Sequence, residues 1–147
     1  MQNVLDISKI KDFDGKFALA VLADQFYQVN TAITAHANGT QAGAVGDATV
    51  LLVSKGINVV GTVATTADSV ALPLVPAPPT GQGAGPTVGW VIVANLGANS
   101  MTVYGSGTDT INGVATATGV AQAANTIALY IPMTTGTAAR WLRVLGG

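Results

Sequence analysis

The chain has 147 residues, of which 49% are hydrophobic and only 9% are charged, and its formal net charge is −1. An ordinary soluble domain carries roughly 25% charged residues, so this chain has too few charges for a typical monomer surface. The absence of cysteine excludes disulfide bonds, thiolate zinc sites and cysteine nucleophiles. A near-neutral chain without a basic cluster is not expected to bind nucleic acid.

The charged residues are concentrated near the N-terminus. Seven lie within the first 24 residues, namely Asp6, Lys9, Lys11, Asp12, Asp14, Lys16 and Asp24. A monomer normally needs a charged surface without large apolar patches, so the rest of the chain predicts a body covered by other subunits. A neutral, Thr/Gly-rich monomer is the alternative. The apolar runs are shorter than the roughly 20 residues of a membrane span, and no secretory signal is seen, so we expect a soluble cytoplasmic product without a membrane partner.

The first element expected is an amphipathic helix over residues 16–34. Its apolar side chains recur at steps of three and four residues, at Leu19, Leu22, Phe26, Val29 and Ile33. The β-branched and aromatic residues of its second half leave a strand beginning near Phe26 as the alternative. We therefore expect an N-terminal arm and helix over residues 1–35 and a β domain over residues 36–147.

From residue 48 onward the apolar residues follow the period of two that is typical of strands. Seven strands are expected, at residues 48–54, 57–62, 69–74, 89–94, 100–104, 126–132 and 140–145. Consecutive strands meet at Lys55-Gly56, at residues 95–99 and at residues 133–139, which predicts hairpins. The proline-rich run 76–86 must be an exposed loop. This pattern favours a mainly β fold, an antiparallel β-sandwich that is jelly-roll-like or barrel-like, with an N-terminal helix or arm.

The stretch GSGTDTING, residues 105–113, fits half of the calcium-binding nonapeptide of parallel β-helices. Such sites need stacked copies of the motif, whereas this chain has one copy with one carboxylate, Asp109. We interpret the stretch as a turn in which Asp109 accepts hydrogen bonds from nearby backbone donors, Ile111 returns to the core and Asn112-Gly113 turns the chain again. It is not a phosphate-binding loop, which would need a lysine leading into a helix.

No set of residues has the spacing of a catalytic site. His36 is the only histidine, and it would need a carboxylate and a hydroxyl, such as Asp68 and Ser69, brought to it by the fold. No nucleophile-elbow spacing accompanies it. We therefore expect no enzymatic activity, no metal site and no cofactor.

The aromatic residues of the predicted strands are expected to fill the core. They are Trp90, Tyr104, Tyr130 and Trp141. Exposed rings with polar neighbours would instead form a carbohydrate-binding platform. Arg140 and Arg143, three residues apart in one strand, are expected on opposite faces of it.

Four stretches in this order resemble a β-rich module of structural proteins of tailed bacteriophages: ITAHANGTQAGA, INVVGTVATTADSVALP, VIVANLGANSMTVYGSGTDTINGVA, and TIALYIP followed by TAARWL. The similarity covers roughly residues 33–145, and every motif in it is structural. The insertion at residues 75–86 is longer than the usual connection, and the arm before Thr34 is not part of the module.

The resemblance implies a non-enzymatic virion structural protein. Because the module makes up nearly the whole chain, it favours a capsid decoration or cement protein on the capsid exterior over a long fibre. Such a protein would form a homo-oligomer, with a trimer favoured, and would bind the major capsid protein to stabilise the phage head. The alternative is a receptor- or glycan-binding head or tail fibre module that uses the loop 76–86.

The N-terminal arm is the candidate for contacts with the capsid or with other subunits. Its charges would pair with the shell, and its apolar anchors would be Ile7, Ile10, Phe13, Phe17, Leu22 and Phe26. The alternative for the arm is an intramolecular helix packed on its own β domain.

Overall fold

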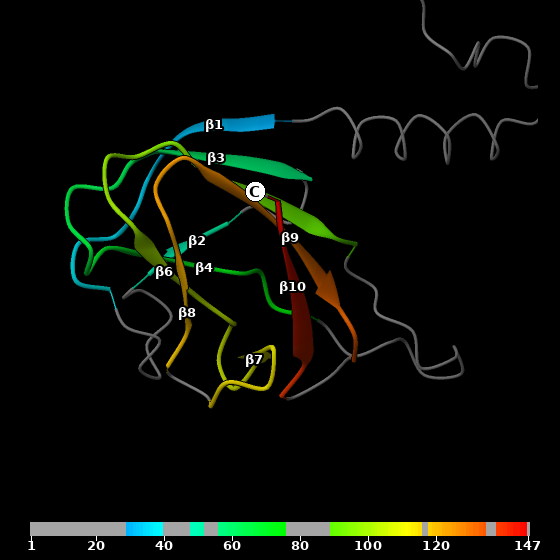
Figure 1. Cartoon of the computed structure of the whole chain (residues 1–147). Helices are drawn as coiled ribbons and strands as arrows, with labels where there is room; N and C mark the ends of the chain where they lie inside the picture. Colours follow the sequence, from blue (N-terminus) through cyan, green and yellow to red (C-terminus); the bar gives the residue numbers. More distant parts are fainter. Residues whose placement is uncertain are drawn as a thin grey trace, which may run out of the picture.

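The computed structural model describes residues 29–39, 48–51, 56–75, 89–115, 118–134 and 138–146. These residues form ten β-strands in two sheets, so the fold is mainly β (Figure 1). The strands are β1 (Val29–Thr34), β2 (Thr49–Val50), β3 (Ile57–Thr62), β4 (Ser69–Ala71), β5 (Val91–Asn95), β6 (Met101–Tyr104), β7 (Thr110–Ile111), β8 (Val120–Gln122), β9 (Thr126–Pro132) and β10 (Arg140–Gly146).

The chain alternates between the two sheets. The larger sheet has the order β1-β3-β5-β9-β10-β7 and the smaller sheet the order β2-β4-β6-β8, so consecutive strands from β1 to β9 lie in different sheets. Alternation makes β1, β3 and β5 parallel neighbours, and likewise β2, β4 and β6. Antiparallel pairs join β5 to β9, β9 to β10 and β6 to β8. Both sheets are therefore mixed, and the prediction of an antiparallel fold is wrong.

Two of the three predicted hairpins do not form. β2 and β3 lie in different sheets, and so do β5 and β6. The turns between them carry the chain across the body instead of reversing it within one sheet. The third hairpin is confirmed, because β9 and β10 pair antiparallel from Trp141 with Pro132 to Gly146 with Ile127.

The helix predicted for residues 16–34 is wrong over its last six residues, which form the strand β1. β1 pairs in parallel with β3, from Val29 opposite Ile57 to Thr34 opposite Thr62. Its β-branched residues fit a pleated surface better than a helix, where their side chains lose rotamer freedom. The alternative strand is thus present, beginning at Val29, and residues 16–28 lie outside the described residues.

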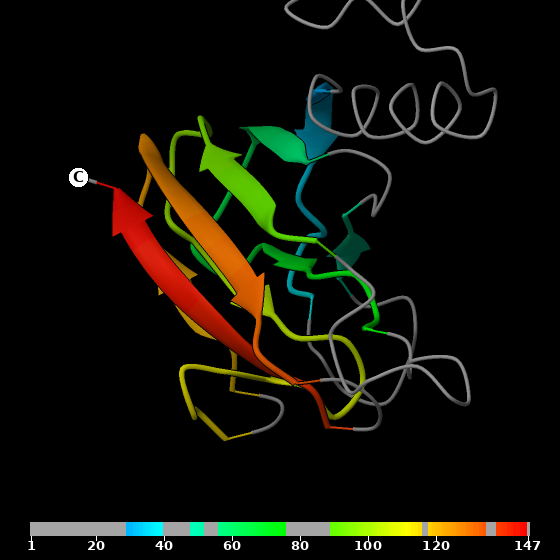
Figure 2. The ribbon, with the colours of Figure 1, turned by 90° about the vertical axis from the view of Figure 1, so that its right-hand side faces the viewer.

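The inner faces of the two sheets share one core. The larger sheet supplies Val60, Val91, Val93, Ala128, Tyr130 and Trp141, and the smaller sheet supplies Val70, Met101, Val103 and Val120. Figure 2 shows β3, β5, β9 and β10 side by side as one twisted layer in front of the smaller sheet.

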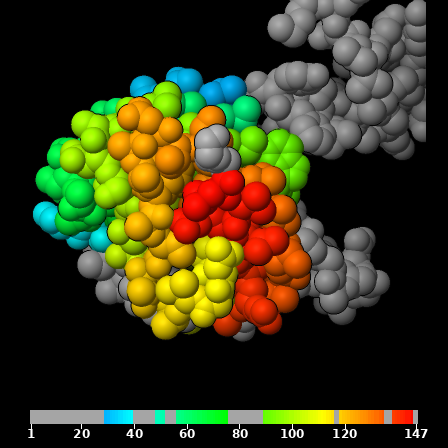
Figure 3. Space-filling view, viewed as in Figure 1, coloured from blue at the N-terminus to red at the C-terminus, as the bar shows by residue number. Residues whose placement is uncertain are grey.

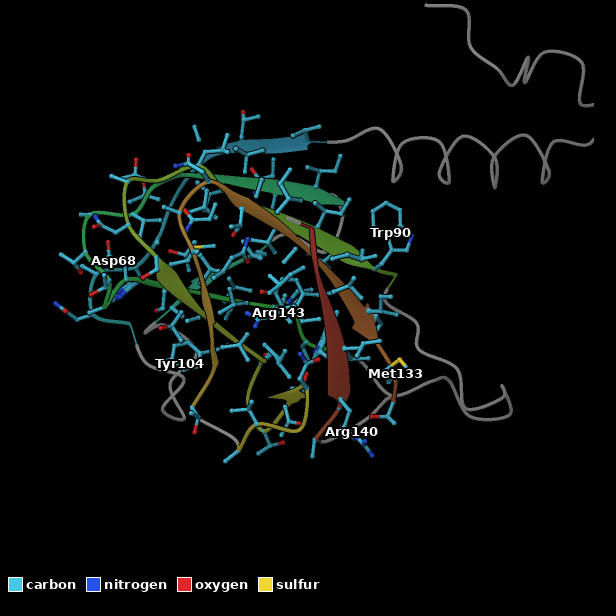
Figure 4. All side chains as sticks on the ribbon, viewed as in Figure 1. Asp68, Trp90, Tyr104, Met133, Arg140 and Arg143 are labelled. Atoms are coloured by element: carbon cyan, nitrogen blue, oxygen red, sulfur yellow. The ribbon has the colours of Figure 1, made fainter. Side chains whose placement is uncertain are left out.

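The predicted core positions hold for two of the four aromatic residues. Tyr130 and Trp141 are buried in the shared core. Trp90 is 37% exposed and lies at the end of the larger sheet, before β5 begins, so its predicted place in the core is wrong (Figure 4). Tyr104 is half-buried.

A buried amide at the end of β5 fixes the crossing from the larger to the smaller sheet. The Nδ2 group of Asn95 donates to the carbonyl of Asn99 at 3.0 Å and to the carbonyls of Gln122 and Ala123, both at 3.1 Å. Its Oδ1 accepts a bond from the Gly97 backbone N–H at 3.0 Å. Asn95 therefore closes the turn after β5 and also ties β5 to the end of β8.

A second buried amide, Gln122 of β8, completes this link from the other side. Its Nε2 group donates to the carbonyls of Val93 at 2.9 Å and Thr126 at 3.2 Å, and its Oε1 accepts from the Tyr130 hydroxyl at 3.0 Å. Burial raises the pKa of Tyr130 to about 12, so the hydroxyl stays protonated and remains a donor. Buried polar groups are costly unless paired, and these pairings hold the two sheets in one relative position.

The same turn requires a glycine for close packing. A Cβ atom on Gly97 would lie 2.6 Å from the Cβ of Val63 and 2.7 Å from the Val63 backbone nitrogen. Asn99 fixes this approach, because its Nδ2 donates to the carbonyls of Val63 at 3.0 Å and Ala64 at 2.8 Å.

We predict that Gly97→Ala lowers the free energy of unfolding by about 1–3 kcal/mol, because the new methyl group overlaps backbone atoms that cannot move aside. The melting temperature should fall by about 2–4 °C for each kcal/mol. Gly61→Ala is the matched control, since nothing lies within 4 Å of the Cβ position of Gly61 in β3. Thermal denaturation followed by circular dichroism measures both, and an equal effect of the two substitutions would contradict the packing argument.

Candidate assembly surface

The face of the larger sheet that points away from the core is apolar across five strands. Strand register places Val29, Ile57, Ile92, Leu129 and Val144 in one continuous row from β1 to β10. Partners in register point to the same side of a sheet. The row therefore forms a single strip of aliphatic side chains.

Two shorter rows flank this strip on the same face. Val59, Ala94 and Ile127 are in register on one side of it, and Ile131 and Leu142 form a pair on the other side. We define the outer face as these ten residues: Val29, Ile57, Val59, Ile92, Ala94, Ile127, Leu129, Ile131, Leu142 and Val144. None of them carries a polar side chain.

Much of the outer face is accessible to solvent. Val29 is 42% exposed, Ile127 53%, Leu142 42% and Val144 48%. Figure 3 shows β9 and β10 reaching the molecular surface side by side. Sheets with one face in water normally alternate apolar and polar residues, whereas sheets covered on both faces are apolar throughout. The pattern here is the one typical of a sheet that is covered on both faces.

Charges are sparse on the described body, and one of them, Arg140, lies on the outer side of the larger sheet. The described residues contain four charged side chains, Asp68, Asp109, Arg140 and Arg143. Figure 4 shows Asp68 and Arg140 at different ends of the body. Arg143 belongs to the inner side of β10, where its Nη1 donates to the Ala121 carbonyl, while Arg140 falls on the other side at the start of the strand. The prediction that the two arginines lie on opposite faces is confirmed.

The turn 105–113 has a structural role, which depends on Asp109. The buried carboxylate accepts a bond from the Ala139 N–H at 2.8 Å and one from Trp141 Nε1 at 3.4 Å. Both donors are distant from Asp109 in sequence, whereas the sequence predicted bonds from nearby backbone donors. Ile111 is buried, and Asn112 and Gly113 have positive φ values of 52° and 74°, so the rest of the predicted turn is confirmed.

Asp68 also has a structural part, in the turn between β3 and β4. Its Oδ2 accepts from the N–H groups of Ala64 at 2.7 Å and Thr65 at 3.2 Å, and its Oδ1 accepts from the Thr65 hydroxyl at 2.7 Å. This arrangement satisfies the donors of the turn that moves the chain from one sheet to the other.

The structure places His36 beside Ser69 without making a catalytic pair. The two residues form an antiparallel bridge through their backbones, with both N–H to carbonyl distances at 2.9 Å. The Ser69 hydroxyl is buried and has no hydrogen-bond partner, so His36 does not activate it. Asp68 holds its own turn instead of orienting the imidazole.

Metal and membrane sites were sought in the same part of the chain. Among the residues that the structure describes, no three His, Asp or Glu side chains are grouped so that they would hold a metal ion. Within those residues there is also no helix with the length and apolar character that a membrane crossing requires.

The sequence-predicted contact residues and the outer face are different parts of the chain. Ile7, Ile10, Phe13, Phe17, Leu22 and Phe26 lie outside the described residues. The outer face was missed because each predicted strand was treated as having one polar side. The signal was present in the runs VIVA of β5 and IALYI of β9, which are apolar at successive positions and are typical of strands buried on both faces.

Comparison with known proteins gives no relative: no family model, no curated protein and no solved structure matches the chain.

We predict that the two aspartates act in opposite directions on the pH dependence of stability. Burial raises the pKa of Asp109 above 3.8, against the bonds from Trp141 and Ala139. Hydrogen bonds, first that of the Thr65 hydroxyl, lower the pKa of Asp68 below 3.8. The free-energy cost of keeping Asp109 charged in the folded state is thus removed as pH falls towards 3.8. The stability that charged Asp68 contributes is instead lost as pH falls below 3.8.

Urea denaturation between neutral and acidic pH measures these contributions. In the native chain, Asp109 should raise the free energy of unfolding as pH falls, and Asp109→Asn should lack this rise. Asp68 should lower the free energy of unfolding at the acidic end, and Asp68→Asn should lack this decrease. The slope with pH is the diagnostic quantity, since each substitution also changes hydrogen bonds by a pH-independent amount. Parallel pH profiles for the native chain and Asp109→Asn would contradict the assignment.

Proposed function

We propose that this chain is a non-enzymatic structural protein of a tailed-bacteriophage virion, a capsid decoration or cement protein that stabilises the head through homo-oligomeric contacts. The observation that carries the proposal is the apolar outer face of the larger sheet. The body would be a β-sandwich whose inner faces form its own core and whose outer face packs against a neighbouring subunit.

The energetics of the outer face fit an assembled particle. Each of its half-exposed aliphatic side chains would contribute about 1–2 kcal/mol on burial, at roughly 25 cal/mol per Å² of apolar area. The four outer-face residues that are about half-exposed, Val29, Ile127, Leu142 and Val144, give a gross gain of about 4–8 kcal/mol, within the 4–15 kcal/mol that association costs. One contact of this kind is therefore weak by itself. Contacts repeated by symmetry become strong through multivalency, which is how a shell-bound protein would be held.

The proposed partners and location follow from the sequence resemblance. It supports the major capsid protein as the partner, a trimer as the favoured oligomer and the capsid exterior as the site, after synthesis in the host cytoplasm. The buried Ser69 hydroxyl and the structural use of Asp68 and Asp109 support a protein without catalytic function.

A receptor- or glycan-binding fibre module is the second candidate function. One observation favours it, the 37% exposure of Trp90 just before β5. An exposed indole ring can stack on a sugar ring. Specific binding on a glycan array that is lost in Trp90→Ala would support this function over decoration.

We predict that Leu142→Lys abolishes self-association, because it places an ammonium group within the proposed apolar contact. Leu74→Lys is the matched control: Leu74 is 60% exposed, follows β4 of the smaller sheet and does not belong to the outer face. Light scattering with size-exclusion chromatography should show oligomers for the native chain and Leu74→Lys, and monomers for Leu142→Lys. A native chain that is monomeric at micromolar concentration would contradict the proposed assembly.

Binding to the shell is tested separately. Purified protein mixed with capsids that lack it should co-sediment with them, and Leu142→Lys should bind more weakly than Leu74→Lys. Absence of binding by an oligomeric native chain would contradict the decoration function while leaving self-association intact.

A further inference from the structure

The outer face extends to the point where the chain leaves the described body. Val29 is the first described residue, the start of the edge strand β1 and one end of the central row of the outer face. The 28 residues before it are therefore joined to the margin of this apolar surface.

The sequence before Val29 has the chemistry that would cover an apolar sheet. Leu19, Leu22 and Phe26 recur at steps of three and four residues, so in a helical conformation they share one side, and Asp24 falls opposite to them. Residues 16–28 as a helix would be about 20 Å long at 1.5 Å per residue. The outer face measures about 19 Å from β1 to β10, at roughly 4.8 Å per strand spacing. The length of such a helix matches the width of the outer face, and its apolar side matches the apolar character of that face.

The connection favours a neighbouring copy over the same chain. To lie on its own outer face, the segment would have to change direction sharply just before Val29. Residues 25–28, QFYQ, contain none of the Gly, Pro, Asn, Asp or Ser residues that usually form tight turns. β1 is also the edge strand of its sheet, so the segment is joined to the margin of the sheet.

We propose that the outer face is the docking site for residues 16–28 of a second copy of this chain, with Leu22 and Phe26 inserted among the side chains of the central row. This rests on the proposed function and names the partner that covers the face. Exchange of this segment between copies buries the apolar surface and leaves the charges of the N-terminal segment in water. Such an exchange links subunits without charged residues on the body, and the body has few charged residues.

Cross-linking in the full chain tests the exchange. Because the chain has no native cysteine, only the introduced cysteines react. Ala23→Cys is placed in one copy, beside the stripe of Leu22 and Phe26, and Val144→Cys in another copy with a different affinity tag. The copies are co-expressed and treated with a short bis-maleimide. The expected product is a covalent dimer that carries both tags. Leu74→Cys in place of Val144→Cys is the control and should give several-fold less.

A second pair of substitutions tests the stripe itself. Phe26→Asp, added to the Ala23→Cys copy, should reduce the mixed-tag product several-fold, because it places a carboxylate among aliphatic side chains. Tyr27→Asp alters the neighbouring aromatic residue, which points away from the stripe in a helix, and should leave the yield close to that of the parent.

The outcomes separate this inference from the proposed function. A cross-link that forms only within a chain carrying both Ala23→Cys and Val144→Cys would overturn exchange in favour of intramolecular docking. Equal yields with Val144→Cys and Leu74→Cys, or no product, would overturn docking of this segment on the outer face. If Leu142→Lys still abolishes association in that case, the outer face is a subunit contact with another occupant, and the proposed function stands.

Discussion

The two buried amides Asn95 and Gln122 are the constraint on which the rest of the structure depends. They join β5, β8 and β9 through bonds to backbone carbonyls and to the Tyr130 hydroxyl. A shift of one residue along any of these strands would leave buried donors and acceptors unpaired, at about 1–3 kcal/mol for each group. It would also exchange the two faces of the strand. The amides therefore decide which side chains of the larger sheet face the core.

Once the inner face is fixed, the composition of the outer face follows. β5 and β9 are apolar at nearly every position, so turning Val93 and Ala128 inward necessarily turns Ile92, Leu129 and Ile127 outward. A chain that needed only one covered face would gain solubility from threonine or lysine at these outward positions. Aliphatic residues there have no part in the internal core, and the proposed subunit contact would account for their presence.

The sequence predicted the positions of most strands but only one of their pairings, that of β9 with β10. Apolar periodicity located β3, β9 and β10 closely, because strand period depends on the local chain alone. One wrong pairing arose because the turn after β5 contains the same small and polar residues as a hairpin turn, whereas Asn95 there bonds to the carbonyls of Gln122 and Ala123 at the end of β8, in the other sheet. The stripe that predicted a helix ended in Val29 and Ile33, where β3 offered pairing that a single sequence does not show. The candidate site required that pairing, since the outer face consists of residues brought into register from five strands.

The low charge of the described body follows from its two apolar faces. A body this small that presents aliphatic side chains on both faces of its larger sheet leaves few positions where a charge can stay hydrated. Both aspartates of the described body stabilise turns. Asp68 accepts hydrogen bonds from the donors after β3, and Asp109 accepts one at the start of β10. The single hydroxyl beside His36 is buried between the sheets. Acid–base and nucleophilic chemistry need ionisable groups that a substrate can reach, whereas holding subunits together needs apolar area and a fixed register. The distribution of the described residues supports the proposed structural role.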